Sequence, residues 1–168
     1  MSRTINVTLS VSSFDKAIRE ILAYKEWVER KAKELARRLA EEGVGLASAK
    51  FVATEIFYDG IAECNVTVEQ RSENTFAVLA NGKTALILEF GAGIRHGGGH
   101  PMAAEMGYGP GTYPGQTHAI EPGFWYYTDS SGKGGNYSEG NPPGMVMYTT
   151  AKDLRNSLER IAKEVFSS

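Results

Sequence analysis

The chain has 168 residues, enough for one domain with a substantial hydrophobic core, and we expect residues 1–168 to form a single domain. A net charge of −2 excludes whole-chain electrostatic attraction to nucleic acid or to an anionic membrane. The one cysteine, Cys64, excludes a disulfide framework within the chain and fits a reducing compartment. No apolar run approaches the ~20 residues of a membrane span, and residues 1–9 lack a signal-peptide pattern, so we expect neither a membrane location nor secretion.

The first part of the chain predicts a strand followed by a long helix. Apolar residues alternate over residues 3–11, which is the period of a half-buried strand. Ser12 or Ser13 is a suitable cap for a helix from about Phe14 to Glu42, which we expect to end at Gly43. The expected core stripe of this helix, with Tyr24 and Trp27 beside it, is Ile18, Ile21, Leu22, Val28, Ala32, Leu35, Ala36 and Leu39.

The apolar period then changes to two, which predicts strands. Residues 51–58 are largely apolar and end at Asp59-Gly60, a tight hairpin signal. The returning strand alternates from Ala62 to Glu69, with Cys64 on its inward face, and a polar turn follows at residues 71–75. These features indicate antiparallel strands joined by short turns.

Two more segments complete the expected sheet. Residues 75–80 are strand-like and end at Asn81-Gly82, a second hairpin signal. Residues 83–90 read as the next strand, although periodicity alone leaves a short buried helix open. A short strand is expected at residues 123–128, and an amphipathic helix begins near Pro143. The expected fold is α+β, with an antiparallel sheet of about four to five strands packed by the long N-terminal helix and the C-terminal helix.

The segment from Gly91 to Gly144, here called the 91–144 arm, has an unusual composition. It holds 15 of the 19 glycines, all 6 prolines and all 3 histidines. Loops of this length inside compact domains are uncommon and usually functional, and rigid aromatic side chains are favoured in protein interfaces. We therefore expect a protein interface whose candidate residues are Tyr108, Tyr113, Phe124, Trp125, Tyr126, Tyr127 and Tyr137.

Catalytic and cofactor sites find little support in the sequence. Gly91-Ala92-Gly93 resembles a phosphate-binding turn, but more glycines and Pro101 follow where such a turn needs a helix. A loop-built metal site is the alternative that stays open, and its candidate ligands are His96, His100, His118, Glu105 and Glu121. Such a site would indicate a metal-dependent hydrolase or nuclease. The first expectation is a protein with no catalytic residues, metal or cofactor.

The order of motifs resembles a known family. Residues 86–93 read Leu-Ile-Leu-Glu-Phe-Gly-Ala-Gly, followed by His100-Pro101 and a Gly-Tyr-Gly-Pro-Gly-Thr-Tyr-Pro-Gly run at 107–115. Trp125-Tyr126 and a Pro-Pro-Gly-Met sequence then precede the final helix. This arrangement is similar to the minor tail-component family of long-tailed bacteriophages and prophages, the neck, tail-completion or head–tail joining proteins.

The resemblance implies structural work in the virion. Such proteins typically form a six-fold ring at the neck around the DNA channel and contact the tail tube and the head connector. They are assembled in the bacterial host cytoplasm, and DNA passes through the lumen without sequence-specific binding, which suits a mildly acidic chain. By resemblance, Glu89, Phe90, Gly91 and Gly93 shape the turn that begins the 91–144 arm.

Overall fold

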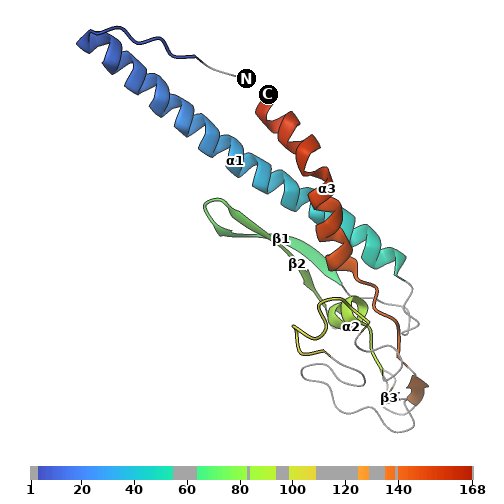
Figure 1. Cartoon of the computed structure of the whole chain (residues 1–168). Coiled ribbons are helices and arrows are strands. Elements are labelled where there is room, and N and C mark those ends of the chain that lie inside the picture. Colours follow the sequence, from blue (N-terminus) through green and yellow to red (C-terminus); the bar gives the residue numbers. More distant parts are fainter. Residues whose placement is uncertain are drawn as a thin grey trace.

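A computed structural model describes residues 4–54, 64–82, 84–93, 99–108, 125–128, 135–138 and 140–167, with the backbone alone for 125–128 and 135–138. Figure 1 shows one very long helix with a shorter helix and a two-stranded ribbon lying beside its second half. In chain order the elements are α1 (Val11–Ala53), β1 (Asn65–Ser72), β2 (Thr75–Asn81), α2 (Ala85–Phe90), β3 (Trp125–Thr128), β4 (Gly135–Ser138) and α3 (Val146–Ser167).

Helix α1 is longer than the sequence suggested, at 43 residues. Ser10 caps it, accepting a hydrogen bond from the Ser13 N–H, so the predicted cap at Ser12 or Ser13 was wrong by two to three positions. The helix also continues through Gly43 to Ala53. A glycine inside a helix costs about 1 kcal/mol, and burial of Ala47 and Phe51 beyond it outweighs that cost.

Gly43 also explains how three elements meet. A Cβ at this position would lie 3.0 Å from both Leu154 Cδ1 on α3 and Val78 Cγ2 on β2. The missing side chain therefore lets α3 and the β1–β2 ribbon approach the same part of α1. The core beside it is built from Ala47, Phe51, Val66, Leu88 and Val146, with Val44, Cys64, Val78, Ala80 and Met147 packed against it.

The predicted sheet of four to five strands was wrong. The described residues form two separate two-stranded antiparallel ribbons, β1–β2 and β3–β4. In the first ribbon Val68 pairs with Val78, and the connecting turn is Glu73-Asn74, within the predicted polar turn. The expected strand at 123–128 appears as β3, which pairs with β4 through Tyr126 and Tyr137.

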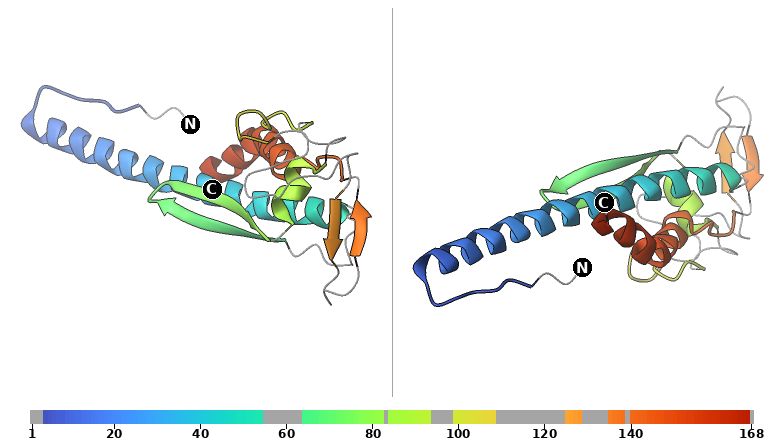
Figure 2. Two further views of the ribbon diagram at one scale, coloured as in Figure 1. Left: turned by 90° about the horizontal axis from the view of Figure 1, so that it is seen from below. Right: turned by 90° about the horizontal axis from the view of Figure 1, so that it is seen from above.

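Three predicted strands account for the difference in strand number. Residues 4–10 form no strand, although their apolar residues alternate. They turn back beside the start of α1 (Figure 2) and pair with no described strand. Residues 51–53 complete α1, and the hairpin signal at Asp59-Gly60 lies outside the described residues. Residues 85–90 form helix α2, which is the short buried helix that periodicity left open as the alternative to a strand. Asn81-Gly82 therefore leads toward a helix and does not make a hairpin.

The first turns of α1 extend beyond α3 and the β1–β2 ribbon (Figure 1). Its predicted core residues Ile18, Ile21 and Leu22 are 55%, 55% and 52% exposed, so the first part of the expected core stripe was wrong. Helical spacing identifies residues that share a face, but no packed element of the described chain covers this face. We call Val11, Phe14, Ile18, Ile21 and Leu22, all of them exposed, the α1 stripe.

Helix α3 packs along the second half of α1. It begins at Val146, three residues after Pro143, so the proline lies before the helix and not in its first turn. Near the other end, Phe166 meets Trp27 edge-on at 5.7 Å between ring centroids, and Tyr24 stacks on Trp27 at 5.6 Å. This aromatic contact joins the end of α3 to the N-terminal half of α1.

Candidate functional site

The most organised polar group of the described residues surrounds Glu89, on the short helix α2. Glu89 is a buried residue, 7% exposed, although its neighbours in α2 are apolar. Glu89 Oε2 accepts a hydrogen bond from the Met147 N–H at 2.6 Å, and Oε1 accepts one from the Tyr148 N–H at 2.9 Å. Both donors belong to the first turn of α3, where free N–H groups and the helix dipole favour a negative charge. Glu89 therefore fixes the start of α3 against α2.

His100 completes the group from the turn at residues 99–108. Its Nδ1 accepts a hydrogen bond from the Met102 N–H at 3.0 Å, so the ring proton resides on Nε2. Nε2 lies 3.0 Å from Glu89 Oε1 and donates to it. The ring is 4% exposed, and both of its nitrogens are engaged. This bond joins the first part of the 91–144 arm to α2 and α3.

Aromatic stacking surrounds the Glu89–His100 pair. Phe90 stacks in parallel on Tyr108 with 3.9 Å between ring centroids, and Phe90 lies 4.4 Å from the His100 ring. Tyr148 also meets the His100 ring, edge to face, with 5.4 Å between ring centroids. These rings exclude water from the carboxylate–imidazole bond, which strengthens it.

The two ends of the 91–144 arm are fastened together at the same place. Ala92 and Asn141 form an antiparallel bridge, with N–H to O distances of 2.8 and 3.0 Å. Asn141 Nδ2 also donates to the Ile87 carbonyl, and the Gly144 N–H donates to the Leu88 carbonyl at 2.7 Å. The Leu88 carbonyl at the C-terminal end of α2 thus gains a partner, and the Ile87 carbonyl, which also accepts from the Gly91 N–H, gains a second one. The two ends of the arm, residues 91–93 and 140–144, are therefore held together against α2, and we call them the arm root.

Backbone conformation at the root requires glycine. Gly91 has a φ of 74°, and a Cβ there would lie 2.6 Å from the Pro143 nitrogen. Gly140 has a φ of 95°, and a Cβ would lie 1.9 Å from the Ala92 carbonyl oxygen. Gly93 has a φ of 96°, in the left-handed region that favours glycine. Glycine is thus needed at both ends of the arm, at Gly91 and Gly93 on one side and at Gly140 on the other.

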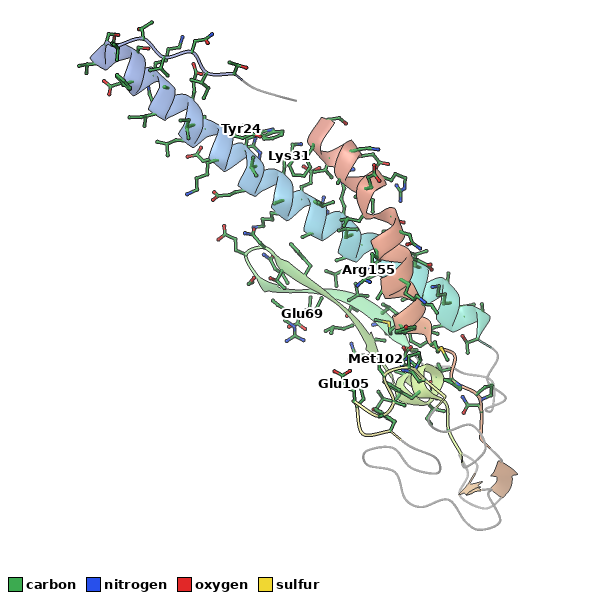
Figure 3. All side chains as sticks on the ribbon, viewed as in Figure 1. Tyr24, Lys31, Glu69, Met102, Glu105 and Arg155 are labelled. Atoms are coloured by element: carbon green, nitrogen blue, oxygen red, sulfur yellow. The ribbon has the colours of Figure 1, made fainter. Side chains whose placement is uncertain are left out.

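An open apolar groove of about 360 Å³ lies beside this root. Its walls come from β2, α2, the 99–108 turn and the start of α3, and include Val78, Ala80, Leu86, Met102, Met106 and Met147. Leu86 is 47% exposed and Met106 is 52% exposed, so apolar surface faces solvent at the groove. Met102 and Glu105 lie at this end of the molecule, far from Tyr24 on the N-terminal half of α1 (Figure 3).

The predicted site residues separate into two groups. The structure brings Glu89, Phe90, Gly91, Gly93 and Tyr108 together at the arm root, and Tyr108 is half-buried there. Trp125, Tyr126 and Tyr127 are in β3, and Tyr137 is in β4, where only the backbone is described. Tyr113 and Phe124 lie outside the described residues.

The metal alternative finds no support within the described part of the chain. There, no three His, Cys, Asp or Glu side chains gather closely enough to hold a metal ion. His100 and Glu105 are described, whereas His96, His118 and Glu121 are not. Cys64 is half-buried, and burial raises the pKa of its thiol, which opposes the thiolate that nucleophilic chemistry needs.

Comparison with protein-family models, curated proteins and solved structures gives no match. Within the described helices, none is long and apolar enough to cross a membrane.

Sequence reasoning missed the partners of Glu89. It treated His100 as a loop residue or a metal ligand and gave Asn141 no role, yet both bond to α2. A signal was present, because Glu89 is the one charged residue in the apolar run Ala85–Phe90. A buried acidic residue needs hydrogen-bond donors, so that position indicates partners elsewhere in the chain.

Proposed function

We propose that this protein is a non-enzymatic structural component of a tailed bacteriophage virion, which acts at the neck by assembling into a ring around the DNA channel. Tail completion and head–tail joining both fall within this proposal, and a hexamer is the stoichiometry expected from the family resemblance. The resemblance comes from the order of sequence motifs. The observation that supports assembly is the exposed α1 stripe.

The α1 stripe is an exposed apolar surface on one face of the helix. Its five side chains are between 48% and 80% exposed. At up to about 200 Å² for a fully exposed Phe14 side chain and less for each aliphatic one, they leave on the order of a few hundred Å² of apolar surface in water. Contiguous apolar patches of several hundred Å² mark interaction sites on soluble proteins. A chain that functions through contacts with copies of itself and with neighbouring virion proteins needs such a surface.

The arm root supports the same proposal. A structural protein that presents a long loop to its neighbours benefits from a rigid attachment, because a loop fixed at its root loses less entropy on binding. Here Glu89, His100 and Asn141 hold the loop ends against α2 and α3. The predicted aromatic interface residues, Trp125 and Tyr126 among them, lie between those ends.

The test is electron microscopy of lysates from a phage or prophage that lacks this gene. DNA-filled heads beside unattached tails are expected for a protein of the head–tail junction, and overlong tails specifically indicate tail termination. A plasmid copy of the gene should restore complete particles, whereas a copy with both Trp125→Ala and Tyr126→Ala should not. Intact, infectious particles from the deletion strain would refute the proposal.

A further inference from the structure

We propose that the α1 stripe of one copy docks into the apolar groove beside the arm root of a second copy, head to tail. This inference rests on the proposed ring assembly and names the contact that forms it. The occupant of the groove is therefore an amphipathic helix of the same chain.

The stripe has the spacing of a helix that binds in a groove. Counted from Val11, its members fall at positions i, i+3, i+7, i+10 and i+11, which places them on one face. Amphipathic helices that lie in apolar grooves use anchors at this spacing. Lys25 and Glu29 occupy the same face further along α1, so the stripe ends after about 18 Å, counting 1.5 Å per residue.

The short stripe argues against simple pairing of two α1 helices. A coiled coil needs apolar positions over at least three to four heptads. The stripe covers fewer than two before Lys25 interrupts it. Pairing of α1 with α1 would also leave the groove uncovered in both copies, whereas a head-to-tail contact covers one stripe and one groove for each copy.

The groove is suited to receive a helix. Met102, Met106 and Met147 line it together with aliphatic residues of β2 and α2. Methionine side chains are flexible and polarisable, so they adapt to the shape of an incoming apolar ridge. Exposed apolar atoms of Leu86 and Met106 lie on the side that a second molecule would approach.

The stripe of one copy is too far from its own groove to fill it. The start of α1 points away from the body, and α2 and Met102, which line the groove, lie at the opposite end (Figures 1 and 3). A contact between two different surfaces of identical chains is heterologous, and it closes only when the repeated rotation forms a ring. This is the symmetry that a neck ring needs.

The available area fits an interface of this kind. Stable interfaces bury about 800 Å² on each partner. The stripe contributes on the order of a few hundred Å² by the same conversion as above, and Leu9, 99% exposed just before α1, adds to it. These apolar side chains therefore supply a substantial part of the surface that one partner needs.

Disulfide trapping of the purified full-length protein tests this contact. In a Cys64→Ser background, Ile18→Cys and Leu86→Cys are introduced together, and the protein is oxidised under mild conditions. A ladder of covalent multimers on a non-reducing gel is expected. When two single-cysteine variants are mixed, Ile18→Cys with Leu86→Cys should give one heterodimer band. The matched control is Ile18→Cys with Val52→Cys, because Val52 is 88% exposed on α1 and does not line the groove; we expect at least tenfold less product.

The outcomes separate this inference from the proposed function. Rings seen by microscopy and native mass spectrometry, without the Ile18–Leu86 crosslink, would overturn the contact and leave ring assembly standing. Efficient homodimers of Ile18→Cys alone would also overturn it, in favour of α1 pairing. A chain that stays monomeric at every concentration, together with normal particles from the deletion strain, would overturn both proposals.

Discussion

Replacing Glu89 with Gln tests whether the buried carboxylate holds α2, the 99–108 turn and α3 together. The substitution keeps the shape of the side chain and one acceptor oxygen. If that oxygen takes the place of Oε1, the new amide group faces the Met147 N–H, which now bonds to Oε2 at 2.6 Å. Two donors then oppose each other in a buried site, and the negative charge at the start of α3 is lost.

The size of the effect follows from the three bonds. One hydrogen bond to a charged group is worth about 1.5–3 kcal/mol. The two retained bonds, to His100 Nε2 and the Tyr148 N–H, become neutral and lose up to about half of their strength. Loss of the charge beside the helix dipole adds about 0.3–1 kcal/mol. The lower ends of these ranges together give a fall of about 3 kcal/mol in the free energy of unfolding, which is the change we expect.

Urea denaturation followed by far-UV circular dichroism measures this change, and thermal unfolding should show a midpoint lower by about 6–12 °C for a chain of this length. The matched control is Glu105→Gln, on an exposed residue of the 99–108 turn, where a change within about 0.5 kcal/mol is expected. Amide exchange at Met147 and Tyr148 should speed up only in the Glu89 variant. If Glu89→Gln unfolds within about 0.5 kcal/mol of the unmodified protein, the carboxylate does not organise this site.

Three other predictions use different parts of the molecule. Gly91→Ala should destabilise the fold by several times the ~1 kcal/mol expected for Gly107→Ala. Both glycines have φ near 75°, but only at Gly91 would a Cβ meet backbone atoms. The urea midpoints of the two variants measure this difference. The hydrogen bonds of Arg160 lower the pKa of Glu42 from 4.5. The unmodified protein should therefore have a larger free energy of unfolding than Arg160→Gln above pH 4.5, and this difference should disappear as the pH falls through the lowered pKa. An equal difference at pH 7 and in strong acid would contradict this. Because burial raises the pKa of the Cys64 thiol, iodoacetamide should label it more slowly at pH 8 in the folded chain than in urea, and equal rates would show the thiol to be accessible.

Local sequence patterns predicted the presence of helices and turns more reliably than which of their faces are packed against other elements. The long N-terminal helix, the C-terminal helix and the polar turn near Glu73 follow from local patterns of apolar and turn residues. The alternation at residues 3–11 is equally clear, yet no strand forms there, because pairing depends on a neighbour that local pattern cannot supply. The same limit applies to Ile18 and Ile21, whose spacing predicts a covered face that is exposed.

The candidate site was predictable only in part. Positive φ at Gly91 and Gly93 agrees with the conformational freedom expected of glycines at a turn. The bonds from Glu89 to His100 and to the first turn of α3 join residues 11 and about 58 positions apart, and no local pattern specifies such a pairing. What the sequence did offer was an acidic residue in an apolar run.

Helix α1 is uninterrupted, so it fixes the distance between the core and the start of the helix as well as contributing residues to the core. Its 43 residues span about 65 Å, and the same uninterrupted rod contains Phe51 in the core and Phe14 near the free end. Inserting seven residues near Lys25 would move the free end outward by about 10 Å and keep its apolar face in nearly the same direction. Inserting five would turn that face to the opposite side. The spacing and orientation of whatever binds the free end are thus fixed by a count of residues.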